Sequence, residues 1–420
     1  MGFASTYLEQ RALFPQIIKE APDKSTGIIV VIPAYNEPGI KKVLDSLAAC
    51  SQPACKVEVI IVVNAPEDAE KESLENNKIT IENIESWKKE NYNCFYRLYG
   101  FAAESQSVRE WGVGLARKTG MDEAVRRFNS TDNPDGVILN LDADCLVKHN
   151  YFVSVSDELL KKRDRSACSI YFEHPLKGND FPENIYKYIT LYELHLRYYF
   201  QGLAYCGFPY GFHTVGSAIA VKAEQYVKAG GMNRRKAGED FYFIQKLVPS
   251  GGYFSLNSTT VYPSPRVSSR VPFGTGATIT RLSEEKLPAL LTYNILAFKE
   301  LRTFFGMTED IFKCKPDDLP ECYKFFPESL ILFLDEKEWT DKMAEIKNNT
   351  SGLTSFRKRF FGWFNMFRIV KYLNYVHSGF FEKKPVDVSA SELLKNIGII
   401  PESGEPADLL FRYRKLEKNS

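Results

Sequence analysis

Continuous apolar runs alternate with helix-like patterns along the first two thirds of the chain. The runs at 27–32, 57–63 and 137–141 have the length and composition of buried strands. The stretches at 39–49 and 112–128 carry apolar or small residues at helical spacing. Consecutive parallel strands need helical crossovers, so this order predicts an α/β fold with a mostly parallel sheet flanked by helices.

The two ends of the chain differ from this pattern. Apolar residues at helical spacing within 5–21 predict a lead-in helix, which Pro15 is expected to kink or split. From about residue 284 onward helical patterns dominate. We therefore divide the chain into an N-terminal lead-in helix (1–25), an α/β domain (26–280) and a helical C-terminal region (281–420).

Polar residues follow each predicted strand. Tyr35–Glu37 follow the first, Asn64 the second, and Asp142 and Asp144 the third. Ligands of open α/β sheets bind at the carboxyl ends of the strands, so these side chains are expected to meet at one edge. Two acids there are costly without a cation, and Mg²⁺ or Mn²⁺ takes oxygen ligands. The alternative is a turn in which the acids cap the next helix.

Two further groups of charged residues stand at helix starts. Glu239 and Asp240 begin a helical pattern, where acidic residues also suit a plain helix cap. Arg117 and Lys118 lie in the glycine-rich helix that opens near residue 112. Small residues allow close packing against a sheet or a phosphate, whereas a solvated helix face is the alternative, favoured for Lys118.

A long loop at 263–276 carries Arg266 and Arg270 among prolines, glycines and hydroxyl residues. Guanidinium groups bind phosphate oxygens by paired hydrogen bonds. An ordinary surface loop is the alternative, but loops of this length usually carry function, so we favour a lid.

Composition restricts the partners. The net charge of +1 argues against nucleic acid, and eight scattered cysteines without paired spacing suit reduced thiols in a cytosol. No apolar window is long enough to span a membrane. Basic and aromatic residues interleave at 355–381, which fits a helix lying on a membrane or, more commonly, one packed on the domain or a subunit partner. We predict a cytoplasmic protein, with peripheral membrane contact and a homo-oligomer left open.

Taken in order, these features resemble family 2 glycosyltransferases of the GT-A fold over about residues 26–280. The resemblance is carried by Val31–Glu37, Gly114–Gly120, Asp142–Asp144, Gly216–Gly231 and Gly238–Asp240. It implies a UDP- or GDP-sugar as donor, Mn²⁺ or Mg²⁺ as cofactor, and a hydroxyl acceptor that the sequence does not identify.

The resemblance also implies roles for single residues. Asp144 would hold the metal, and Asp142 would share it or contact the ribose. Asp240 would act as general base on the acceptor hydroxyl, with Glu239 positioning acceptor or donor sugar. Donor binding is assigned to Pro33, Ala34, Tyr35, Glu37, Asn64, Arg117, Asp142, Arg266 and Arg270.

Departures from the family pattern qualify these roles. Asn64 stands where many relatives have aspartate, which leaves the nucleobase open. The Gln-x-x-Arg-Trp signature of processive synthases is absent, so we expect transfer of a single sugar. No histidine lies between Asp240 and His377, where some retaining relatives have a metal ligand, and for His213 a structural role is expected. We favour inversion.

Two alternatives remain. The first is a retaining transferase of the mannosylglycerate or glucosylglycerate synthase type. The second is a nucleotide-sugar-binding protein without activity, whose helical C-terminal region serves assembly. A nucleotidylyltransferase is less favoured, because the first strand runs into Pro33–Glu37 rather than a glycine-rich loop.

Overall fold

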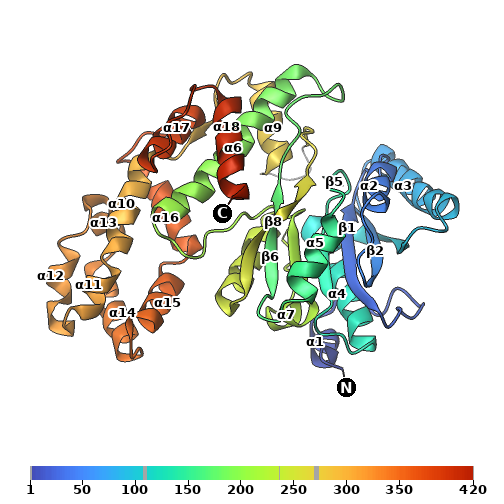
Figure 1. Cartoon of the computed structure of the whole chain (residues 1–420), viewed down its shortest axis with the longest axis horizontal. Coiled ribbons are helices and arrows are strands. Elements are labelled where there is room, and N and C mark those ends of the chain that lie inside the picture. Colours follow the sequence, from blue (N-terminus) through green and yellow to red (C-terminus); the bar gives the residue numbers. More distant parts are fainter. Residues whose placement is uncertain (1, 107–110, 236, 269–273, 420) are drawn as a thin grey trace. The chain divides into compact units, whose positions relative to one another are not determined.

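The computed structural model describes residues 2–106, 111–235, 237–268 and 274–419 (Figure 1). Contacts divide the chain into two compact units. The first comprises 1–186, 214–280 and 418–420, and the second comprises 187–213 and 281–417. Residues 187–213 thus pack with the C-terminal helices, although they come from the middle of the chain. The domain boundaries at 25 and 280 stay a prediction.

The first unit is built on an eight-stranded sheet with the order β3-β2-β1-β4-β7-β6-β8-β5. The strands are β1 (Thr26–Ala34), β2 (Lys56–Pro66), β3 (Tyr96–Gln106), β4 (Val137–Asn140), β5 (Leu146–Val147), β6 (Ala167–Phe172), β7 (Ile219–Lys222) and β8 (Tyr253–Tyr262). Strands β3, β2, β1 and β4 are parallel. Strand β7 is antiparallel to β4 and β6, while β8 is parallel to β6 and antiparallel to β5. The predicted α/β fold with a mostly parallel sheet is confirmed.

Helices connect and cover these strands. They are α1 (Ser5–Gln10), α2 (Lys41–Ala48), α3 (Lys71–Glu90), α4 (Val113–Ser130), α5 (Tyr151–Val155), α7 (Ala223–Lys228) and α8 (Glu239–Leu247). Helix α9 (Thr275–Glu284) begins in this unit and ends in the second. A π-helical turn, Ser156–Leu160, extends α5. Helix α4 packs on β1 and β2. Gly120 permits this close approach, because an added Cβ would lie 2.5 Å from Cγ1 of Val31.

The predicted lead-in helix is wrong beyond Gln10, where α1 ends. The chain that follows is held in irregular structure by side chains of α4. Glu123 accepts hydrogen bonds from the backbone N–H groups of Ile17 and Ile18, and Arg126 donates to the carbonyl of Phe14. These bonds satisfy backbone groups that a helix would otherwise pair internally. Apolar spacing alone does not reveal partners more than a hundred residues away.

The second unit is helical, as expected for the C-terminal region. Its helices are α10 (Ile295–Gly306), α11 (Thr308–Lys313), α12 (Leu319–Tyr323), α13 (Glu328–Phe333), α14 (Glu336–Asn348), α15 (Leu353–Trp363), α16 (Met366–Val376) and α17 (Val386–Asn396). Most of α6 (Glu183–Tyr205) and most of α18 (Pro406–Lys418) also lie in this unit. Two short strands, β9 (Leu291–Thr292) and β10 (Lys384–Pro385), pair antiparallel. Phe360, Phe361 and Phe364 of the 355–381 segment are buried against Phe304 and Phe305. These three aromatic residues therefore belong to the core, as the packed-helix interpretation expects, whereas Phe380 is 39% exposed. Membrane contact of the segment stays a prediction.

None of the described helices is long and apolar enough to cross a membrane.

Candidate functional site

The turn after β1 is fixed by α3. Asn36 adopts a left-handed conformation with φ 57°, which asparagine tolerates better than most residues. Its backbone N–H donates to Oδ1 of Asn77 at 2.9 Å, and its Oδ1 accepts from Nδ2 of Asn76 at 2.7 Å. Strand β1 extends beyond the apolar run at 27–32 and includes Pro33 and Ala34. Proline has no backbone N–H, but the pairing of β1 with β4 ends at Val31, so Pro33 is tolerated in the strand.

An aromatic pair lies beside this turn. The rings of Tyr35 and Trp111 meet edge to face, with centroids 4.9 Å apart. Asn64 is buried within β2, and its Nδ2 donates to the carbonyl of Gly112 at 3.1 Å. Trp111 is a candidate that the sequence did not single out, because a lone tryptophan before a helix forms no motif. Only the fold brings it to the predicted donor-binding residue Tyr35.

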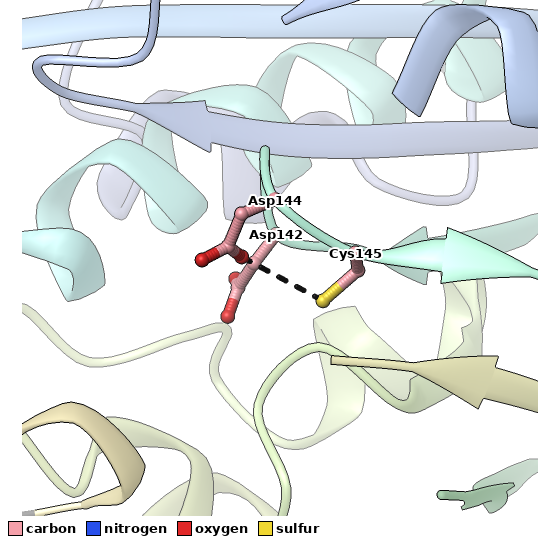
Figure 2. A group of neighbouring side chains, drawn as sticks. All are labelled: Asp142, Asp144 and Cys145. Atoms are coloured by element: carbon pink, nitrogen blue, oxygen red, sulfur yellow. Dashed lines mark hydrogen bonds between the residues drawn. The ribbon is translucent and has the colours of Figure 1, made fainter. Parts of the chain in front are cut away.

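The two acids after β4 come together as predicted, although they lie in a turn beyond the strand rather than on it. Ligand atoms of Asp142, Asp144 and Cys145 all lie within 4.8 Å of one another. Figure 2 shows the two carboxylates side by side and pointing the same way, with the Cys145 thiol donating to Asp144. The next helix, α5, has Asn150 at its N-cap. The acids therefore do not cap that helix.

Arg117 connects the acid pair to α8. One guanidinium nitrogen forms an ion pair with Asp142 and the other with Glu239. The Arg117 and Glu239 side chains are only 4% and 3% exposed, so the solvated-face alternative is wrong for Arg117. Burial alone lowers the pKa of Arg117, but the carboxylates of Asp142 and Glu239 outweigh it and hold that pKa above its ordinary value. The guanidinium fits because Gly216 has no Cβ, which would lie 2.3 Å from Nη1.

The position predicted for Lys118 is also wrong. We favoured a solvated position, but its side chain is buried and bonded to Asp122 at 2.8 Å and to the hydroxyl of Tyr7 at 3.1 Å. This lysine anchors α1 to α4 and does not join the acid pair.

Asp240 stands at the start of α8, next to Glu239. Its Oδ1 accepts a hydrogen bond from the backbone N–H of Phe241 at 2.6 Å. Burial raises the pKa of Asp240 to about 7, the neighbouring Glu239 carboxylate adds to this, and Arg117 opposes it. The N-cap of α8 is Gly238, which makes no side-chain cap. A carboxyl group with a pKa near neutrality suits proton transfer better than helix capping.

Arg266 bridges two parts of the site. Its terminal nitrogens donate to both carboxylate oxygens of Glu37, one of them at 2.9 Å, and its Nε lies 2.6 Å from Oδ2 of Asp144. The loop that we predicted to be a lid therefore reaches the acid pair. Arg270, the second predicted lid residue, lies outside the described residues.

His213 belongs to the second unit. Its Nε2 lies 3.0 Å from Oε2 of Glu417, and its ring stacks on Phe200. These contacts fit the structural role that we expected for it.

Comparisons with known proteins give distant structural likenesses only. No family model and no curated protein matches the chain. Residues 1–349 of S. aureus TarS, in complex with UDP-GlcNAc, match with a TM-score of 0.40 at 15% identity over 79% of this chain and 89% of that one. The mannosyltransferase PcManGT from Pyrobaculum calidifontis, in complex with GDP-Man and Mn²⁺, matches with a TM-score of 0.37 at 14% identity over 89% and 91%. Glucosyl-3-phosphoglycerate synthase from Mycobacterium tuberculosis, in complex with Mg²⁺ and UDP, matches with a TM-score of 0.34 at 15% identity over 64% and 84%. At these distances the function has to be argued from the chain's own residues.

Proposed function

We propose that this protein is a metal-dependent glycosyltransferase that moves one sugar from a UDP- or GDP-sugar to an acceptor hydroxyl, with inversion. The observation that carries the proposal is the buried arginine, Arg117, which joins the acid pair to the helix start that holds Asp240. One charged network thus links a place for the diphosphate to a group that can accept a proton.

The acid pair fits a divalent cation. Asp142 and Asp144 are partly exposed and offer oxygen ligands at the edge of the sheet, which suits Mg²⁺ or Mn²⁺ because these ions keep several waters. The Arg266 guanidinium already balances the charge of Asp144, which agrees with a site built to hold positive charge. A bound divalent cation would neutralise charge that develops on the diphosphate leaving group.

Donor recognition is assigned to the turn after β1 and its neighbours. The Tyr35 and Trp111 rings supply an aromatic surface for a nucleobase. Because Nδ2 of Asn64 is bonded to Gly112, its Oδ1 is the side-chain atom left to accept an N–H of the base. Pro33 and Ala34 frame the same end of β1.

In the proposed reaction Asp240 accepts the proton of the acceptor, and Arg266 neutralises negative charge on the departing diphosphate. The acceptor oxygen bonds to the anomeric carbon, the bond to the diphosphate breaks, and Asp240 takes the hydroxyl proton. Arg266 would leave Glu37 and Asp144 to bind the diphosphate, which closes the loop over the donor and limits its hydrolysis. Glu239, held by Arg117, would position the sugar or acceptor beside Asp240.

The proposal is tested by incubating the protein and Mn²⁺ with a panel of UDP- and GDP-sugars and hydroxyl acceptors. Release of the nucleoside diphosphate measures transfer, and NMR of the product gives its anomeric configuration. We expect an inverted product. A retained configuration would instead favour an enzyme of the mannosylglycerate or glucosylglycerate synthase type. Donor binding without release for any acceptor would favour the non-catalytic alternative.

A further inference from the structure

Two cysteines of the second unit lie in contact, away from the residues assigned to sugar transfer. Cys314 is the residue after α11, and Cys322 lies in α12. Their sulfur atoms are 2.9 Å apart, with the Cys322 thiol donating to Cys314. Both are half-exposed, so a small reagent can reach them. The spacing of eight residues in sequence matches no familiar motif, and the contact arises from the bend between the two helices.

A lysine places positive charge beside the pair. Nζ of Lys347 donates to the carbonyl of Cys314 at 2.5 Å and to those of Ile311 and Phe312 at 2.9 and 2.5 Å. Burial lowers the pKa of Lys347, while negative charge on Cys314 and Cys322 raises it. The ammonium group of Lys347 opposes the rise in the pKa of the Cys322 thiol, and the thiolate is the reactive form in disulfide exchange.

The two thiols differ in role. Burial raises the pKa of Cys322 to about 12, and its hydrogen bond to Cys314 adds to this. In the contact between the two thiols Cys322 donates and Cys314 accepts, so Cys314 is the sulfur placed to attack first. A metal is disfavoured, because the described residues contain only one cluster of three or more candidate metal ligands, at Asp142–Cys145.

We propose that Cys314 and Cys322 form a reversible redox pair that is oxidised by small disulfides such as oxidised glutathione. The Cys314 thiolate attacks one sulfur of oxidised glutathione, breaks its disulfide and releases the first glutathione. Cys322 then loses its proton and attacks the sulfur of Cys314, releasing the second glutathione. The protein dithiol is oxidised by two electrons, and one glutathione disulfide becomes two thiols. The new bond joins the end of α11 to α12.

Mass spectrometry detects the disulfide between Cys314 and Cys322 directly. Trypsin cuts after Lys313 and Lys324, whereas the bond after Lys315 precedes Pro316 and resists cleavage, so both thiols fall in the single peptide 314–324. The full-length protein is equilibrated with mixtures of reduced and oxidised glutathione, quenched in acid, alkylated and digested. In the wild type we expect the two alkylation sites to disappear together, leaving a peptide two hydrogens lighter than the reduced one.

Matched variants test the order of attack. Cys322→Ser is expected to accumulate one glutathione on Cys314, while in Cys314→Ser the remaining thiol reacts at least about tenfold more slowly. Cys94→Ser, which removes a thiol elsewhere in the chain, should leave the pair unchanged. Independent glutathione addition at both positions of the wild type, or no internal disulfide even in fully oxidised buffer, would overturn the proposal. Faster reaction of Cys322 than of Cys314 would overturn the assigned order.

Discussion

Replacing Asp240 with asparagine should remove activity and at the same time stabilise the protein. The two effects have one cause, because the carboxylate is held where burial and the Glu239 charge raise its pKa from 3.8 to about 7. Asparagine has nearly the same shape, carries no charge, and keeps an oxygen that can accept from the backbone N–H of Phe241. The variant therefore removes the base without removing the hydrogen bond at the helix start.

The sign of the stability effect follows from proton uptake on folding. Below about pH 4 the Asp240 carboxyl is protonated in both folded and unfolded chains, so it contributes no pH-dependent penalty. Between about pH 4 and 7 the folded protein holds a proton that the unfolded chain has released, and stability falls as pH rises. A rise in the pKa of Asp240 from 3.8 to about 7 corresponds to a loss of at most about 4 kcal/mol in the free energy of unfolding above pH 7.

The assay is urea unfolding of wild type and Asp240→Asn at pH 5 and pH 8. We expect the variant to be more stable by about 2–4 kcal/mol at pH 8 and by clearly less at pH 5. Its rate of nucleoside diphosphate release should fall about 10²–10⁴-fold at pH 8, while wild-type activity should decline as pH falls through 7. Equal stability of the two proteins at pH 8, or activity kept within about tenfold, would refute the role given to Asp240.

Two further variants test the neighbouring arginines. Gly216→Ala places a Cβ 2.3 Å from Nη1 of Arg117, so we expect a loss of about 1–3 kcal/mol in urea unfolding and weaker donor binding. Gly39→Ala, where an added Cβ meets nothing within 4 Å, is its control and should bind donor normally. Arg266→Gln removes the cation that pairs with Asp144. Calorimetry without donor should then show that Mn²⁺ binds this variant about tenfold more tightly than the wild type. With Mn²⁺ present, the donor should bind the variant more weakly. Unchanged Mn²⁺ affinity would contradict a competition between Arg266 and the metal.

The central strands could be predicted because strands buried on both faces of a parallel sheet appear in the sequence as uninterrupted apolar runs. β1, β2 and β4 appear where those runs lie and are neighbours in the sheet, although Asn64 lies within β2 rather than after it. The meeting of Asp142 with Asp144 followed from the same rule, although a turn rather than a strand holds them.

The partners of the charged residues could not be predicted in this way. Arg117 and Lys118 are adjacent on one helix, yet one turns to Asp142 and the other to Asp122. Which carboxylate each meets depends on packing between segments far apart in the sequence. The same holds for Trp111, whose neighbour Tyr35 is 76 positions away, and for the irregular chain after α1.

The central claim is that the acid pair binds the donor diphosphate through a divalent cation. It is tested most directly by titrating UDP- and GDP-sugars into wild type and Asp144→Ala by calorimetry, with and without Mn²⁺. We predict that at least one donor binds the wild type only when Mn²⁺ is present, and that Asp144→Ala abolishes this dependence together with tight binding. Donor binding that needs no metal and is unchanged in Asp144→Ala would contradict the account.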